Sequence, residues 1–265
     1  MKSQIFAWLY GKAGCCSDLT MVNSSWTEDH ITKLWRKKGG IVHKIYPPCD
    51  VKKFKELSRD ANEDVDNEDK EITILSLGQF RPEKDHPLQI RAMFELRQIL
   101  PEDKWDKVRL IIVGGCRNAE DESRVQDLKD LCKHLSVENN VEFRTNISFA
   151  ELCQLVRTSH MGIHTMWNEH FGIAVVEMLA GGLLTIAHRS GGPLMDIIVE
   201  DSNGRNGFLS VNDKEYAANI SFILGMTPEG RQNIRERARA SVERFSDREF
   251  ETGWLRASES LINNC

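Results

Sequence analysis

The chain has 265 residues, 40% of them hydrophobic, so it can bury a core in one large domain or in one domain and part of another. Its formal net charge is −5 with both signs interspersed, which argues against a dedicated nucleic-acid binder, because such proteins usually carry a basic excess. The seven cysteines form no C-x-x-C pair, which predicts a reduced, cytosol-facing protein without a disulfide framework or zinc site.

The first 50 residues contain one expected strand–helix–strand unit. The strands are expected in "DLTMVNSSW" and "VHKIYPP", and between them "TEDHITKLWRKKG" should form a capped helix that Gly39 and Gly40 end. Residues 51–71 are polar and acidic, with almost no apolar residue after Leu57. This composition predicts a solvated linker and a domain boundary.

From residue 72 onward, short apolar runs alternate with amphipathic stretches. The expected strands are "EITILSLGQF", "VRLIIVGGC", "NVEFRT", "HMGIHT" and "LLTIAHRS". Between them, Leu88 and Ala92 begin a run at helical spacing, and Ser148 with Glu151 has the pattern of a capping box. This alternation predicts an α/β fold with a doubly wound, Rossmann-like parallel sheet over residues 72–245.

After about residue 213 no further strand is expected, and helices should run to the end of the chain. Residues 246–265 form the last of them, and Phe250, Trp254 and Leu261 fall on one side of it. An apolar stripe of this kind needs a partner surface.

Three loops follow expected strands and carry polar chemistry, and ligands of open parallel sheets bind at such strand ends. The first, "LGQFRPEKDHP", places Arg81 and Lys84 before a helix, where both cations could converge on a phosphate or remain solvated. The second, "VGGC" at residues 113–116, allows close backbone approach, but it is neither a dinucleotide fingerprint nor a phosphate-binding loop.

The third loop lies in "WNEHFGIAVVEMLAGG", where Glu169 precedes a helix and Glu177 falls within it. The N–H groups of Phe171, Gly172 and Ile173 are the unpaired donors of the helix start and suit a phosphate or sugar oxygen. Glu177 needs partners because the helix is apolar nearly all round. Glu169 could accept from a hydroxyl group, or could only be a charge that the helix dipole favours. Together the loops favour a phosphorylated, hydroxyl-rich ligand.

Four histidines near this stretch could indicate a metal site: His160, His164, His170 and His188. His160 and His164 have the spacing of a helical ligand pair, but on a strand they lie roughly 13 Å apart. No metal site is predicted.

The stretch "EHFGIAVVE" resembles the E-x₇-E signature of retaining family 4 glycosyltransferases with the GT-B architecture, in which two Rossmann-like domains face a cleft. A G-x-x-x-x-E-K loop from Gly78 to Lys84 precedes it, and "SGGP" at residues 190–193 follows it. The stretches "MVNSSWTEDHI", "YPPCDV", "GQFRPEKDHPLQIRA", "HTMWNEHFGI" and "ARASVERFSD" are similar to the eukaryotic α-1,2-mannosyltransferases of asparagine-linked glycosylation. These enzymes use GDP-mannose and a dolichol-linked oligosaccharide acceptor.

The resemblance implies a role for each candidate residue. Glu177 would bind the ribose hydroxyls of GDP, Glu169 the hydroxyls of mannose, and Lys84 the diphosphate. The family's neighbouring arginine is Gln79 here, so Arg81 is the implied substitute.

The glycines and the helix start complete the implied donor site. Phe171, Gly172 and Ile173 would offer backbone amides, while Gly78 and Gly115 belong to the loops that would line the donor. The implied reaction is retaining transfer through an oxocarbenium-like transition state, with no metal or other cofactor.

The resemblance also implies binding partners, a cellular location and a missing N-terminal part. The partners would be GDP-mannose, the dolichol-linked acceptor and other early mannosyltransferases of the pathway, at the cytosolic face of the endoplasmic reticulum membrane. Residues 1–50 would be the remnant of an N-terminal acceptor domain, to which residues 246–265 return, and the chain would be truncated at its N-terminus. Two alternatives stay open: a non-catalytic nucleotide-sugar-binding module, and a nucleotide-sugar epimerase of similar architecture.

Overall fold

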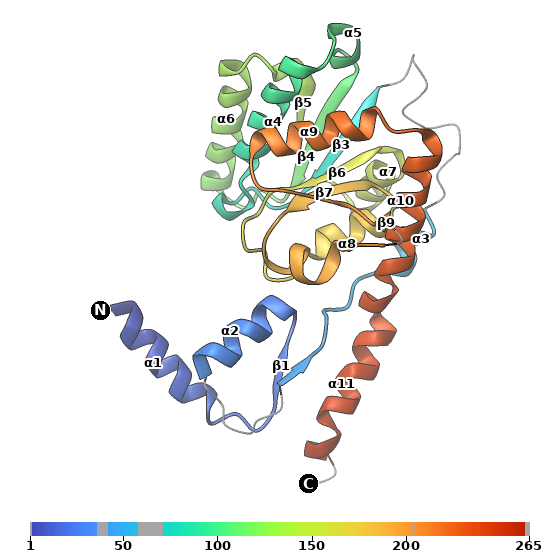
Figure 1. Ribbon diagram of the computed structural model, residues 1–265. Coiled ribbons are helices and arrows are strands. Elements are labelled where there is room, and N and C mark those ends of the chain that lie inside the picture. The colour runs from blue at the N-terminus through green and yellow to red at the C-terminus, as the bar shows by residue number, and fades with distance from the viewer. Residues whose placement is uncertain (1, 36–41, 58–70, 203, 263–265) are drawn as a thin grey trace.

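The computed structural model describes residues 2–35, 42–57, 71–202 and 204–262 (Figure 1). The expected helix end at Gly39 and Gly40, and most of the expected acidic linker, lie outside these residues. No helix of the described residues is both long enough and apolar enough to cross a membrane.

The expected strand–helix–strand unit near the N-terminus is confirmed. Helix α1 (Lys2–Gly14) precedes β1 (Thr20–Val22), α2 (Ser25–Trp35) and β2 (Val42–Lys44), and the two strands pair in parallel. In Figure 1 this unit lies apart from the large sheet, with α1 and α2 beside one another. The unit is therefore a small α/β element of its own, which residues 45–50 connect to the next part of the chain.

The first residues of the expected linker are folded, in contrast to the solvated segment predicted from their composition. Val51–Lys55 forms helix α3, whose N-cap Asp50 accepts a hydrogen bond from the backbone N–H of Lys53 at 3.3 Å. Val51 and Phe54 are buried, and α3 packs on α8 (Ile173–Ala180). The two apolar residues lie three positions apart on one helix face, so a single turn buries both.

The predicted doubly wound sheet is confirmed. Its six strands run in the order β10-β7-β6-β3-β4-β5, and every pair is parallel. The strands are β3 (Ile72–Leu77), β4 (Val108–Gly114), β5 (Val141–Thr145), β6 (Met161–His164), β7 (Leu184–His188) and β10 (Phe208–Ser210). The three-residue edge strand β10 was not predicted.

Helices cover both faces of this sheet (Figure 1). Ile74 on β3 belongs to the core beneath α4 (His86–Ile99), α6 (Ala119–His134) and α9 (Asp213–Leu224). Leu75, the next residue, belongs to the core beneath α3, α7 (Phe149–Thr158), α8 and α10 (Pro228–Ser241). Successive side chains of a strand point to opposite faces, so unbroken apolar strands require both layers.

The remaining elements are short, apart from the last helix. They are η1 (Pro82–Lys84), α5 (Glu102–Trp105), η2 (Glu138–Asn140), η3 (Pro193–Ile197), β8 (Glu200–Asp201), β9 (Gly204–Arg205), η4 (Val242–Phe245) and α11 (Asp247–Ile262). The expected capping box of α7 is present, with Ser148 and Glu151 bonded reciprocally. In Figure 1, α11 extends away from the sheet toward the side where α1 and α2 lie, and its Trp254 and Leu255 are exposed.

Candidate active site at the strand carboxyl ends

A lysine and a glutamate from two different loops form an ion pair at the carboxyl edge of the sheet. Lys84 ends η1 in the loop after β3, and Glu169 lies in the loop between β6 and α8. Nζ of Lys84 donates to Oε2 of Glu169 at 2.6 Å and lies 3.3 Å from Sδ of Met166. The side chains are 23% and 16% exposed. A pair so shielded from water is stronger than an ordinary surface ion pair.

The Lys84 loop is held to the Glu169 loop through its backbone. The Thr165 hydroxyl lies 2.8 Å from the carbonyl oxygen of Lys84 and 3.0 Å from that of Asp85. Nε2 of the buried Gln89 donates to the same hydroxyl at 2.9 Å. Lys84 is therefore positioned by its carbonyl as well as by its ammonium group.

Glu169 is held as a carboxylate. Burial by itself would raise the pKa of Glu169, but His164 and Lys84 outweigh it and lower the pKa to about 2. Nε2 of His164, at the end of β6, lies 3.3 Å from Oε2 of Glu169. A carboxylate that stays ionised can accept hydrogen bonds from hydroxyl groups at any physiological pH.

The loop that carries Glu169 rests on the residues after β7. The N–H of Gly192 donates to the carbonyl oxygen of Glu169 at 2.7 Å, and the N–H of Asn168 donates to Oγ of Ser190 at 2.8 Å. That Oγ also lies 2.8 Å from Nδ1 of His188. A Cβ on Gly191 would approach the same carbonyl to 2.2 Å, so the two loops are in direct backbone contact.

The start of α8 faces the same edge of the sheet. Its N-cap is Gly172, which has a φ of +116° and offers no side-chain cap, and Ile173 at the first helical position is 43% exposed. Phe171 is buried, and its ring lies 5.6 Å from that of Tyr46 and 5.2 Å from that of Phe245. The helix start is thus anchored by one aromatic side chain and leaves donors available to an anion.

Glu177 lies on α8, eight residues after Glu169 in the sequence, and is only partly exposed. Within the described residues, no hydrogen bond or ion pair to its carboxyl group is found. Burial raises the pKa of Glu177 to about 7, and the negative charge of Asp50 adds to this rise. Among the residues that the structure describes, Glu177 thus has no partner, which suits a group that accepts hydrogen bonds from ligand hydroxyls.

The two glutamates should affect stability in different pH ranges. Unfolded glutamate titrates near 4.5, so folded Glu177 holds its proton between pH 4.5 and 7, and its contribution to stability falls as the pH rises through that window. Glu169 loses its contribution only as the pH falls from 4.5 toward 2. We expect Glu177→Gln to gain roughly 2 kcal/mol over the unaltered chain at pH 8, and nothing at pH 4.

Denaturant unfolding at several pH values measures this gain as a difference between variants. The difference is needed because burial lowers the pKa of His86 to about 4, so His86 makes stability rise with pH in the window where Glu177 makes it fall. The contribution of His86 is the same in both variants and cancels in the difference. Glu259→Gln, at an exposed position of α11, is the control and should show no difference. A pH-independent offset for Glu177→Gln would contradict the assignment.

The two glycine loops lie against each other at the ends of β3 and β4. A Cβ on Gly114 would meet the carbonyl oxygen of Gly78 at 2.1 Å, and the N–H of Phe80 donates to the carbonyl oxygen of Gly115 at 3.3 Å. The Asn146 side chain accepts from the N–H of Cys116 at 2.8 Å and donates to its carbonyl oxygen at 2.9 Å. A Cβ on Gly78 would lie 3.5 Å from the Lys84 side chain, so Gly78 borders the site, and Gly114 and Gly115 pack behind it.

Arg81 is not brought to the Lys84–Glu169 pair. Its Nη1 lies 3.8 Å from Oε1 of Glu83, and its side chain lines a pocket of about 440 Å³ that Arg124 and Leu128 of α6 also line. Lys84 is the loop cation that meets Glu169. The implied pairing of Arg81 with a diphosphate would require its side chain to turn from α6.

The N-terminal unit meets the site through a buried aspartate that the sequence did not single out. Asp196 on η3 accepts from the N–H and the hydroxyl of Ser25 at 2.8 and 2.6 Å and from the hydroxyl of Tyr46 at 2.9 Å. Nζ of Lys44 lies 3.6 Å away, and the side chain of Asp196 is 1% exposed. Beside it, the ring of Trp26 stacks on His170 at 4.5 Å, so α2 touches the residue after Glu169.

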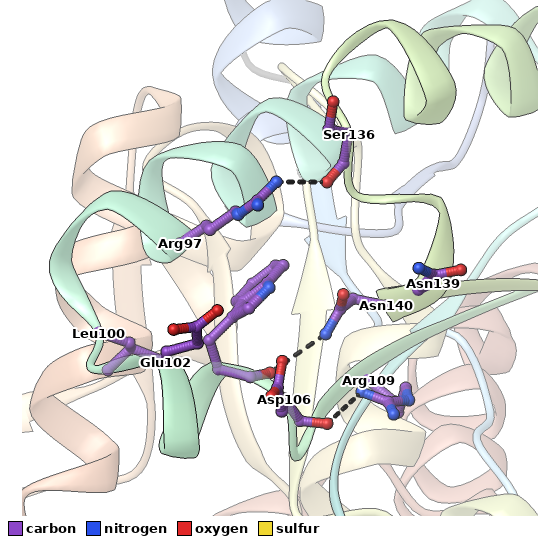
Figure 2. Close-up of a pocket in the computed structure, with 9 residues that line it drawn as sticks. Arg97, Leu100, Glu102, Asp106, Arg109, Ser136, Asn139 and Asn140 are labelled. Carbon is purple, nitrogen blue, oxygen red and sulfur yellow. Dashed lines mark hydrogen bonds between the residues drawn. The ribbon is translucent and has the colours of Figure 1, made fainter.

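The four histidines are not gathered at one point within the described part of the chain. Nδ1 of His160 accepts from the N–H of Thr73 at the amino end of β6, away from His164. In the described ranges there is no group of three or more metal-ligating side chains. Figure 2 shows a pocket of about 470 Å³ near the start of β4, at the opposite edge of the sheet, where Arg97 donates to the carbonyl oxygen of Ser136 at 2.6 Å.

Two solved structures share this fold at 19% sequence identity. The fold is similar to a glycosyltransferase from Rickettsia africae ESF-5, with a TM-score of 0.74 and 19% identity over 91% of this chain and 63% of that one. It is similar also to sucrose-phosphate synthase from Thermosynechococcus elongatus, with a TM-score of 0.79 and 19% identity over 99% and 63%. The class that this fold defines is the parallel-sheet α/β fold of GT-B glycosyltransferases, as predicted.

The family follows from the sequence matches. The family model "Glycosyl transferases group 1" matches residues 58–241, and the model "ALG11 mannosyltransferase N-terminus" matches residues 2–35. The chain therefore belongs to the group 1 glycosyl transferases, and the predicted family resemblance is confirmed.

Curated relatives share one name, "GDP-Man:Man(3)GlcNAc(2)-PP-Dol alpha-1,2-mannosyltransferase". The chain is 49% identical to that of Xenopus laevis over 258 residues, 97% of this chain and 52% of the relative. It is 47% identical to that of Homo sapiens over 262 residues, 97% and 51% respectively, and 37% identical to that of Caenorhabditis elegans over 259 residues, 98% and 54%. The chain spans about half the length of these relatives.

Proposed function

We propose that this chain binds GDP-mannose and takes part in retaining α-1,2 transfer of mannose onto a dolichol-diphosphate-linked oligosaccharide. The observation that carries the proposal is the partly buried Lys84–Glu169 pair beside the start of α8, together with Glu177 on that helix, which is also partly buried and has no partner among the described residues. A cation, helix N–H groups and two carboxylates suit the phosphates and hydroxyls of a nucleotide sugar. The names of the relatives supply the donor and the acceptor.

Each group then has a distinct part in the reaction. Lys84 and the N–H groups at the start of α8 stabilise the negative charge that develops on the diphosphate as the mannosyl–phosphate bond breaks. Glu169 accepts from mannose hydroxyls, and Glu177 accepts from the ribose. Arg81 joins the diphosphate only if it turns from α6, and no metal is required for these contacts.

A dolichol-linked acceptor is confined to a membrane, so we place the protein at the endoplasmic reticulum, facing the cytosol where reduced cysteines persist. The six cysteines that the structure describes are free. Other early mannosyltransferases of the same pathway are proposed as neighbours.

Nucleotide selectivity tests the donor assignment. Titration calorimetry of the 265-residue chain should show GDP and GDP-mannose binding at least about tenfold more tightly than UDP and UDP-glucose, since a site that reads a base rejects one lacking its polar partners. Equal affinities would remove the mannosyl assignment.

Transfer is tested separately from binding. Mannose from labelled GDP-mannose should appear on a dolichol-linked oligosaccharide presented in detergent micelles. Selective GDP binding without transfer would instead support the second candidate, a nucleotide-sugar-binding module.

A further inference from the structure

Glu169 has a second neighbour besides Lys84 that can donate a hydrogen bond. Nε2 of His164 lies 3.3 Å from Oε2 of Glu169, the same oxygen that Lys84 contacts at 2.6 Å. The His164 side chain is 3% exposed. Among the described residues, its Nε2 makes no well-aligned hydrogen bond, so a buried ring nitrogen lies beside the carboxylate without being fully engaged.

The position of His164 is fixed by the sheet. It is the last residue of β6, which pairs with β3 on one side and β7 on the other. The buried hydroxyl of Tyr216 donates to the carbonyl oxygen of His164 at 2.8 Å. The imidazole is thus presented to Glu169 from a rigid element, whereas Lys84 reaches Glu169 on a flexible side chain.

Donor binding makes conflicting demands on the ion pair. Under the proposed function, Lys84 must engage the diphosphate while Glu169 receives mannose hydroxyls. An ammonium group that turns to the phosphates leaves a largely buried carboxylate without its closest partner, which is unfavourable. A second donor to the same carboxylate would remove that difficulty.

We propose that His164 is a positioning residue that holds the Glu169 carboxylate through Nε2–H while Lys84 engages the donor diphosphate. The proposal rests on the proposed function and adds a residue to it. Once Lys84 no longer fixes Oε2, the carboxylate can rotate and align with the imidazole. Glu169 then keeps its place for the sugar, and the cation is used for the leaving group.

Three variants of the full chain test this role. His164→Leu removes the donor at similar volume, His164→Gln keeps an N–H donor at comparable reach, and His134→Leu is a control at the exposed end of α6. His164→Leu should lower affinity for GDP-mannose about 10- to 100-fold, as expected for loss of a hydrogen bond to a charged group. Affinity for GDP alone should change less than about threefold, and His164→Gln should recover most of the loss.

Carbon NMR titration of Glu169 gives a readout that needs no nucleotide. In His164→Leu the pKa of Glu169 should rise from about 2 toward 4.5, whereas His134→Leu should leave it unchanged. The proposal is contradicted if Glu169 has the same pKa in His164→Leu and His134→Leu and if His164→Leu weakens GDP-mannose binding no more than GDP binding. His164 would then have a packing role alone. If the unaltered chain binds no GDP, the proposed function fails, and the titration still decides about His164. Should His164→Leu not fold, His164→Gln is compared with the unaltered chain. Because glutamine keeps an N–H donor, the ratio of the affinity for GDP-mannose to the affinity for GDP should be the same in both, and a lower ratio in His164→Gln would contradict the proposal.

Discussion

Lys84→Met should lower the affinity for GDP and for GDP-mannose by about 100-fold or more, since a charge-assisted contact to the diphosphate is lost together with its long-range attraction. The same change removes the ammonium group from Glu169 and leaves the His164 imidazole beside the carboxylate. Removing one partner of a fully buried pair costs about 3–5 kcal/mol. Because this pair is partly exposed, we expect a loss of roughly 2 kcal/mol in the free energy of unfolding.

Calorimetry and denaturant unfolding at pH 7 check both expectations. Lys133→Met is the matched control, because Lys133 pairs with Asp130 at 3.4 Å with both side chains more than half exposed. It should change stability by less than about 0.5 kcal/mol and leave binding intact. The double variant Lys84→Met/Glu169→Gln should recover stability without recovering binding, since neither group is then left charged and alone. Undiminished GDP affinity in Lys84→Met would exclude it from the diphosphate site.

The fold was predictable because its signals are local. Short unbroken apolar runs such as "RLIIVGG" between amphipathic stretches indicate strands covered on both faces, and Ser148 with Glu151 marks the start of α7. Strand β10 was missed because three residues carry too little pattern, and it exists through pairing with β7. Helix α3 was missed because Val51 and Phe54 are two apolar residues within a charged segment, and burial on α8 decides their structure.

The candidate site was predictable in position but not in its contacts. The structure places Glu169 on the loop and Glu177 in the helix, as expected from the Phe-Gly step between them. The pairing of Lys84 with Glu169 spans 85 residues and depends on the register of β3 with β6, which the sequence does not state. His164 was weighed only as a metal ligand, although its place at a strand's carboxyl end was a signal for the site.

Ser190 and Asp196 show a second limit to prediction from the sequence. Each acts by holding another segment in place: Ser190 bonds the Glu169 loop, and Asp196 bonds the N-terminal unit. These contacts could not be predicted from the sequence, because the partners are backbone groups or hydroxyls from distant loops. In the "SGGP" stretch, the two glycines that follow Ser190 restrict the Glu169 loop more tightly than the Ser190 hydrogen bond does, because both lie against its backbone.

Gly191→Ala should disturb the Glu169 loop strongly. Gly191 has a φ of +58°, where a side chain is strained, and its Cβ would lie 2.2 Å from the carbonyl oxygen of Glu169. Backbone cannot give way as a flexible side chain can, so the loop must shift. We expect a loss of roughly 2–4 kcal/mol in the free energy of unfolding, as for other strained backbone positions.

The functional consequence should depend on which part of the donor is probed. Glu169 faces the sugar in the proposed site, so Gly191→Ala should weaken GDP-mannose binding at least about tenfold more than it weakens GDP binding. Gly225→Ala is the control: Gly225 has a φ of −87° and its Cβ would meet atoms only at 3.6 Å and beyond, so stability should hold or rise by about 0.5 kcal/mol. If both variants unfold and bind alike, the close backbone contact between the two loops does not position Glu169. If Gly191→Ala weakens GDP and GDP-mannose equally, the loop supports the nucleotide, and the sugar contact must be sought on another residue.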